Sequence, residues 1–138
     1  MSEIPTLPFE APDWRLANKP AAHIALALAF ADGPAPVAAV VRNAGPRRWL
    51  LIGDAPFAES ADFKLIDLSL ARERLELSGP GAAAKLATGT SVALADGASA
   101  QTLFGALAIH LTRTGPQSYE ILVARSFAAS LWRALTHA

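Results

Sequence analysis

Cysteine is absent from this sequence of 138 residues, and charge of either sign is in short supply. Without cysteine the chain has no disulfide, no thiolate ligand for zinc and no cysteine nucleophile. Lysine and arginine together number 12, as do aspartate and glutamate, so the net charge is zero. Such a chain has no long-range field that attracts phosphate groups or anionic lipid. We therefore expect no nucleic-acid partner and no membrane partner.

Long apolar runs are also missing from the sequence. No run approaches the roughly 20 apolar residues that a bilayer-crossing helix needs. The segment Met1-Ser2-Glu3-Ile4-Pro5 lacks the basic region and the apolar core of a signal peptide. Together with the lack of cysteine, these absences predict a cytoplasmic protein.

Apolar residues make up 52% of the chain, which is ample for a hydrophobic core, whereas charged residues make up only 17%. This balance favours some association with a partner or with a second copy, although the abundant alanine explains part of it. Four prolines lie in the first twenty residues, at positions 5, 8, 12 and 20, and they favour an extended segment over a helix. We therefore expect an extended arm over residues 1–20 and a single domain over residues 21–138.

Alternating residue size predicts strands in the first half of this domain. Between Ala21 and Phe30, large apolar residues alternate with alanine and histidine, which gives one heavy face and one face of small side chains. The alanines also suit a helix, but the strict alternation and the turn residues Asp32-Gly33-Pro34 favour a strand. Further strands are predicted at residues 37–42, 48–52 and 63–68.

The middle of the chain predicts a strand, a tight turn and a short helix. Leu75 and Leu77 alternate with polar residues up to Ser78, which is typical of a half-buried strand. We expect Gly79 to cap the helix that follows, with Pro80 as its first residue. The helix should cover Ala82 to Leu86, and Gly89 should end it in a left-handed conformation.

The last third predicts a long hairpin followed by an amphipathic helix. One strand is expected from Gln101 to Arg113, a turn at residues 114–117 and a partner strand at residues 119–123. Phe127, Leu131 and Leu135 recur at helical spacing and should form the buried row of the final helix. The predicted fold class is α+β, with one antiparallel-rich sheet and the helices packed on one of its faces.

Candidate catalytic and metal-binding residues are few and dispersed. The three histidines, at positions 23, 110 and 137, form no pair with metal-ligand spacing. His110 falls on the strand face opposite its apolar neighbours, so we expect a solvated or hydrogen-bonded histidine there. Four serines lack the Gly-x-Ser-x-Gly context of a nucleophile; they are Ser69, Ser78, Ser126 and Ser130.

Four other features have both a functional and a structural interpretation, and the structural one is favoured each time. Asp67, at a strand end, is expected to form a turn with Ser69. Gly79-Pro80-Gly81 lacks the further residues of a nucleotide-binding loop and should only shape a turn. Arg72, Arg74 and Arg125 could form an anion-binding patch, but Glu73 and Glu76 lie between them in the sequence, so a salt-bridged face is favoured. Three tryptophans, Trp14, Trp49 and Trp132, could line a groove, but aromatic residues in strands and helices are more often core residues. We assign no catalytic, cofactor-binding or metal-binding residue to this chain.

Four segments of the sequence, in the same order, resemble the gamma-subunit family of heterotetrameric sarcosine oxidase. They are Asp67-Leu68-Ser69, Leu77-Ser78-Gly79-Pro80-Gly81-Ala82, Thr102-Leu103-Phe104-Gly105 and Arg125-Ser126-Phe127-Ala128. The first two also resemble the folate-binding domain of aminomethyltransferases. The resemblance covers residues 49–138.

This resemblance implies the fold of the aminomethyltransferase folate-binding domain and a non-catalytic role. The chain would support assembly of a complex that oxidatively demethylates sarcosine or a related N-methyl amino acid. It implies large partner subunits that hold FAD, FMN, NAD and tetrahydrofolate, zinc in the smallest subunit, and no cofactor in this chain. Two alternatives stay open: a free-standing folate or one-carbon binding protein, and a homo-oligomer of the same fold that acts without the large subunits.

Overall fold

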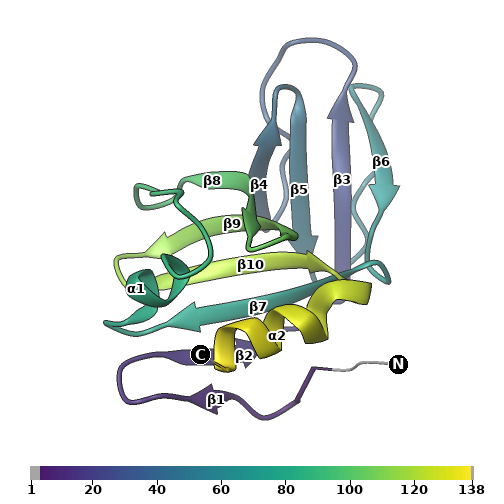
Figure 1. Ribbon diagram of the computed structural model, residues 1–138. Coiled ribbons are helices and arrows are strands. Elements are labelled where there is room, and N and C mark those ends of the chain that lie inside the picture. Colours follow the sequence, from purple (N-terminus) through teal and green to yellow (C-terminus); the bar gives the residue numbers. More distant parts are fainter. Residues whose placement is uncertain (1–3, 138) are drawn as a thin grey trace. The chain divides into compact units, whose positions relative to one another are not determined.

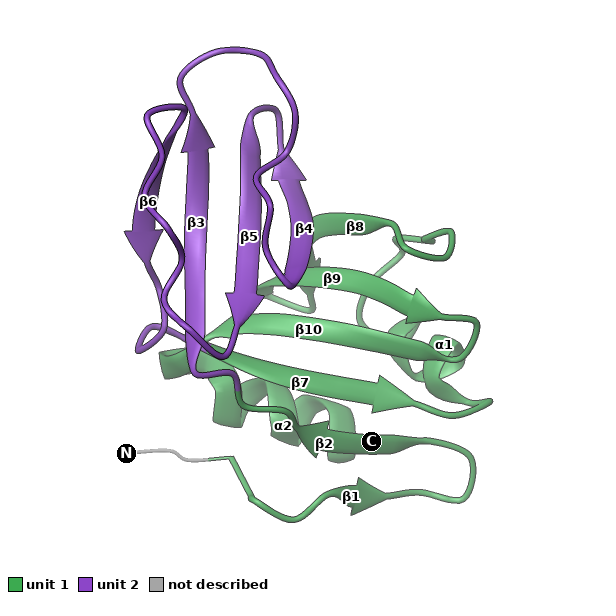
Figure 2. Ribbon diagram, turned by 180° about the vertical axis from the view of Figure 1, so that it is seen from behind, with its two compact units in different colours: residues 1–20, 73–138 green, residues 21–72 purple. Residues whose placement is uncertain are grey.

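A computed structural model describes residues 4–137 of the chain. Residues 1–3 of the expected arm and residue 138 of the expected domain lie outside the described residues. By their internal contacts the residues form two compact units, residues 1–20 with 73–138 (unit 1) and residues 21–72 (unit 2), coloured separately in Figure 2. The division expected from the sequence, at residue 20 alone, stays a prediction.

Unit 1 contains a six-stranded sheet in the order β1-β2-β7-β10-β9-β8. The strands are β1 (Phe9–Glu10), β2 (Arg15–Asn18), β7 (Arg72–Ser78), β8 (Ser99–Phe104), β9 (Leu107–Gly115) and β10 (Ser118–Ala124). The helices α1 (Ala82–Leu86) and α2 (Ala128–Thr136) lie on the same face of this sheet, and the 3-10 turn η1 (Arg125–Phe127) leads into α2 (Figure 1). Helices packed on one face were expected from the sequence.

The core of unit 1 lies between this face and the helices. Leu75 and Leu77 of β7 join apolar residues of β9 and β10 in one cluster, together with Leu131 and Leu135 of α2. These four leucines are fully buried, and burial of each such side chain contributes about 1.5 to 3 kcal/mol. The expected burial of Phe127 is wrong, because Phe127 ends the 3-10 turn before α2 and is 47% exposed.

The first twenty residues contribute two strands to unit 1. β2 pairs antiparallel with β7, so that Asn18 lies opposite Leu75, and β1 pairs with β2. Phe9 and Trp14 stack with ring centroids 5.2 Å apart and pack against the core cluster. These two aromatic residues therefore fix the hairpin to the unit.

The glycines after β7 allow the chain to approach this hairpin closely. The helix covers Ala82–Leu86 as predicted, but its N-cap is Gly81, so the expected cap at Gly79 is wrong. Gly79 has a φ of 118°, and a Cβ there would lie 2.6 Å from the carbonyl oxygen of Asp13. A Cβ at Gly81 would clash with the Asp13 carboxylate. Both positions therefore need glycine because of the hairpin, which no local pattern reveals.

Two further expectations in unit 1 are corrected. The single strand from Gln101 to Arg113 is in fact two strands, β8 and β9, which pair antiparallel across a two-residue turn. Gly105 is the first turn residue and has a φ of 58°, which glycine adopts at no steric cost. Gly89 does not end α1 in a left-handed conformation; it makes room for Phe104, whose ring would lie 2.5 Å from a Cβ there.

Unit 2 is a separate four-stranded antiparallel sheet in the order β4-β5-β3-β6. Its strands are β3 (His23–Ala29), β4 (Val40–Gly45), β5 (Arg48–Gly53) and β6 (Phe63–Asp67). The α+β class is confirmed, but the described residues form two sheets in place of the one expected. Side-chain alternation fixes which face of a strand is buried, whereas the choice of neighbouring strand depends on pairing between distant segments.

Candidate functional site

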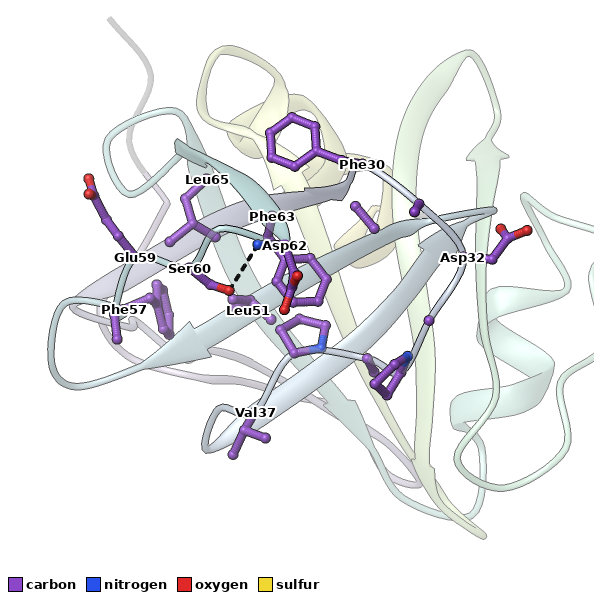
Figure 3. Close-up of a pocket in the computed structure, with 17 residues that line it drawn as sticks. Phe30, Asp32, Val37, Leu51, Phe57, Glu59, Ser60, Asp62, Phe63 and Leu65 are labelled. Atoms are coloured by element: carbon purple, nitrogen blue, oxygen red, sulfur yellow. Dashed lines mark hydrogen bonds between the residues drawn. The ribbon is translucent and has the colours of Figure 1, made fainter.

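A cavity of about 510 Å³ lies within unit 2 (Figure 3). It is bounded by the end of β3, the loop of residues 30–37, residues 57–60 and the start of β6. Leu51 of β5 and Leu65 of β6 contribute apolar side chains to its lining. All of these residues belong to one compact unit.

The small face of β3 makes room on this side of the sheet. Ala27 lies opposite Trp49 of β5 on one side and Leu65 of β6 on the other, and Ala29 lies opposite Phe63. Because alanine does not fill the space above the sheet, the rings of Trp49 and Phe63 meet across β3. Their centroids are 5.8 Å apart and their planes are nearly perpendicular, a favourable aromatic geometry.

The loop after β3 forms a second wall of the cavity. It contains Pro34 and Pro36, which fix the backbone and remove amide donors, so this segment cannot join the sheet as a further central strand. Phe30 and Val37 line the cavity from this loop and are 65% and 101% exposed. The loop therefore presents apolar side chains to both the cavity and the solvent.

Three carboxylates line the cavity, and they differ in their partners. The Asp32 carboxylate is 2.8 Å from the Arg47 guanidinium and is neutralised by it. The Asp62 amide donates to the Ser60 hydroxyl over 3.1 Å, which orders the turn before β6. Within residues 4–137, the carboxylates of Glu59 and Asp62 have no cationic partner. Figure 3 shows Asp62 among the central side chains, with Asp32 and Glu59 toward opposite ends.

Asp67 forms the turn with Ser69 that the sequence predicted. The Ser69 hydroxyl and amide donate to the Asp67 carboxylate over 2.7 and 2.9 Å. These two hydrogen bonds, with a smaller effect of the His23 charge, lower the pKa of Asp67 below its ordinary value. The Ser69 hydroxyl also accepts a hydrogen bond from the Ile24 amide, so the turn is tied to the start of β3.

The three histidines occupy different environments. His23 makes an edge contact with Phe57 in unit 2, with centroids 6.5 Å apart. His110 lies on the face of β9 opposite Ile109 and Leu111 as expected, but it is only 3% exposed, so it is not a solvated residue. His137 is exposed. Among the described residues, no three histidine or carboxylate side chains gather as a metal ion would require.

The remaining candidate residues have structural contacts. Arg74 pairs with Glu120 over 2.9 Å and Arg125 with Glu73 over 2.9 Å, which confirms the salt-bridged interpretation for both. Arg72 donates to the Ala71 carbonyl. Trp14 and Trp132 belong to the core of unit 1 and Trp49 to the sheet of unit 2. Ser69 of unit 2 donates its hydroxyl hydrogen bond to Asp67, whereas the other three serines, Ser78, Ser126 and Ser130, lie in unit 1.

Sequence reasoning missed the cavity, although two signals of it were present. The alternation of β3 predicted a face of small side chains, and the proline-containing segment after it predicted a loop. Neither signal shows that the loop returns over that face, because this depends on the length and path of the connection.

Neither helix of the described chain has the length and hydropathy needed to cross a membrane.

Comparisons with solved structures show that the fold of this chain occurs in a protein of known structure. A scan against protein-family models and a search of curated proteins gave no match. A chain of the heterotetrameric sarcosine oxidase from Corynebacterium sp. U-96, in complex with pyrrole 2-carboxylate, is similar with a TM-score of 0.74 and 24% identity. The match covers 89% of this chain and 82% of that chain. The two chains therefore share a fold over most of their length.

Proposed function

We propose that this chain is a non-catalytic, gamma-type subunit of a complex related to heterotetrameric sarcosine oxidase. In this role it supports assembly of the complex, and the oxidative demethylation of sarcosine or another N-methyl amino acid takes place in large partner subunits. Those subunits would hold FAD, FMN, NAD and tetrahydrofolate, and this chain would hold no cofactor.

The observation that carries this proposal is the fold shared with a chain of such a complex over 89% of the sequence. The four sequence segments that resemble the gamma-subunit family support it, because they occur in the same order along the chain. In the fold these segments form a turn at Asp67, the close approach at Gly79, the β8–β9 hairpin and the start of α2. We therefore propose that the family resemblance extends to the aminomethyltransferase-like fold.

Exposed apolar side chains are consistent with a subunit role. Among residues 4–137, six large hydrophobic residues are at least 47% exposed, and contact with a partner would remove them from water. They are Leu7, Phe30, Val37, Leu70, Leu103 and Phe127.

The test is co-expression of the tagged chain with the large sarcosine oxidase subunits encoded in its own source organism. We expect the chain to elute from a sizing column with a protein that absorbs at flavin wavelengths, and we expect sarcosine-dependent oxygen consumption by that fraction. A matched preparation without the chain should assemble less completely. A chain that elutes alone, with unchanged assembly of the large subunits, would contradict the proposal.

A free-standing binding protein is the second candidate function, and the cavity of about 510 Å³ favours it. Its volume lies within the range of small-molecule sites. Titration of the isolated chain with tetrahydrofolate, followed by calorimetry, tests the folate ligand that the resemblance implies. Light scattering on the same sample separates a monomeric binding protein from a homo-oligomer.

A further inference from the structure

We propose that the cavity of unit 2 binds a small organic cation, namely an ammonium group carried on an apolar or aromatic body. This inference is independent of the proposed subunit function, because it concerns a site formed within unit 2 alone. It rests on the size of the cavity, on its apolar walls and on the imbalance of charge among its lining residues.

The walls of the cavity suit an apolar ligand body. Leu51, Phe63 and Leu65 line it from the sheet, Phe57 lines it from the connection between β5 and β6, and Pro34 and Pro36 line it from the loop after β3. A volume of about 510 Å³ exceeds that of a few water molecules and is typical of sites for small organic ligands. A fully hydrated metal ion would leave these apolar surfaces uncovered.

The charge of the lining selects a cation. Of the three lining carboxylates, only Asp32 has a cationic partner, Arg47. Glu59 and Asp62 carry negative charge that no described cation offsets, and no lysine, arginine or histidine lines the cavity. An anionic group would therefore be repelled from the vicinity of Glu59 and Asp62, whereas an ammonium group there gains a charge-assisted hydrogen bond.

The aromatic lining adds to this preference. A phenyl ring attracts a cation to its face, and the attraction grows when water is excluded from the contact. Phe63 follows Asp62 directly in the chain and lines the same cavity. We therefore assign the Asp62 carboxylate as the main partner of the ammonium group and Phe63 as part of the wall for the apolar body.

The test uses three small probes with the same phenyl group and different charge: phenethylamine, 2-phenylethanol and 3-phenylpropionate. Binding to the full chain is followed by heteronuclear NMR at low ionic strength. We expect phenethylamine to shift amide signals of residues 30–37 and 57–65, and to bind at least about tenfold more tightly than the neutral and anionic probes.

Charge-removing variants assign the effect to the cavity. Asp62→Asn should weaken phenethylamine binding by about tenfold, and Glu59→Gln should weaken it by a smaller factor. Asp54→Asn is the matched control, since Asp54 is an exposed carboxylate of the same unit that does not line the cavity. It should leave the affinity within about twofold of the parent value.

Three outcomes would overturn the proposal. The first is no saturable binding of phenethylamine up to its solubility limit. The second is equal affinity for all three probes, which would mean that the carboxylates do not select the ligand. The third is equal weakening by Asp62→Asn and Asp54→Asn. None of these results bears on co-assembly with large subunits, so failure here and failure of the proposed function are distinguishable.

Discussion

Individual side chains in unit 1 differ sharply in burial even where the sequence pattern treats them alike. Phe127 and Leu131 occupy the same predicted row, yet Phe127 is 47% exposed and Leu131 is fully buried. Helical spacing predicts that the two side chains lie on the same side of one helix. Phe127 instead precedes α2 and lies in a 3-10 turn, so this spacing does not apply to it. The effect of a substitution therefore follows from burial in the fold and not from residue size.

Leu131→Ala should lower the free energy of unfolding by about 2 to 5 kcal/mol, because it leaves a cavity in the core. Phe127→Ala removes more atoms but should cost less, because half of that ring is already in water. Equilibrium urea unfolding of both variants checks this order. A larger loss for Phe127→Ala would contradict the packing described for α2.

Gly81→Ala should destabilise the chain by about 1 to 3 kcal/mol, because the added Cβ clashes with the Asp13 carboxylate. The variant Gly33→Ala is the control, since nothing lies within 4 Å of a Cβ at that position. Shortening the opposing side chain with Asp13→Ala in the Gly81→Ala background should recover part of the loss. Additive effects in this double-mutant cycle would show that the two residues do not contact each other.

Asp67 should stabilise the folded chain only while it is ionised. Its pKa is lower in the folded chain, because Ser69 donates two hydrogen bonds to the carboxylate. The stabilisation is therefore present above the unfolded-state pKa of about 4 and is lost as the pH falls through the folded value. The difference in denaturation midpoint between the parent and Asp67→Asn should shrink from pH 7 to pH 2. In a Ser69→Ala background, the effect of Asp67→Asn on the midpoint at pH 7 should also be smaller. An equal difference at both pH values would contradict this.

Among the elements, β3 illustrates what the sequence predicts and what it does not. Its strand character, its heavy face and its alanine face follow from alternation alone, and the structure confirms the strand over His23–Ala29. The local sequence patterns also predicted the strands β5, β6 and β10 and the helix α1. The β8–β9 turn was missed because Gly105 lies within a continuous run of strand-forming residues, and only its φ of 58° reveals the turn.

The alanine face gives a prediction at the scale of this sheet. Ala27→Leu should destabilise the chain by about 1 to 3 kcal/mol, because the larger side chain must displace the packed rings of Trp49 and Phe63. Ala29→Leu instead adds volume at a residue that lines the cavity, so it should cost less stability and should abolish phenethylamine binding. Thermal unfolding and the NMR titration measure the two effects separately.

At the scale of the whole molecule, the candidate site was not predictable because it depends on how a loop returns over a sheet. The sequence supports the α+β class, but it does not indicate that residues 21–72 form a sheet of their own. Local patterns do not specify that β2 pairs with β7 while β3 pairs with β5 and β6. Those pairings create both the second sheet and the cavity.

Unit 1 should fold without residues 21–72. Every member of its core cluster comes from residues 1–20 or 73–138, and the Lys19 amide donates to the Arg74 carbonyl over 2.8 Å. A chain that joins residue 20 to residue 73 through a short glycine-serine linker should therefore show cooperative urea unfolding and dispersed NMR signals. A non-cooperative transition would show that unit 1 depends on unit 2.

The pairing of β2 with β7 also has a consequence for the order of folding. The two strands are neighbours in the sheet, but all of residues 20–73 lie between the bonded pair Lys19 and Arg74. Closing so long a loop while it is unstructured costs more entropy than closing a short one, and distant contacts form slowly. Once residues 21–72 have formed their own sheet, in which Ala25 of β3 pairs with Asp67 of β6, the two ends of the loop are already close together. We therefore expect protection of β3 and β5 amides to precede protection of β2 in pulse-labelled refolding.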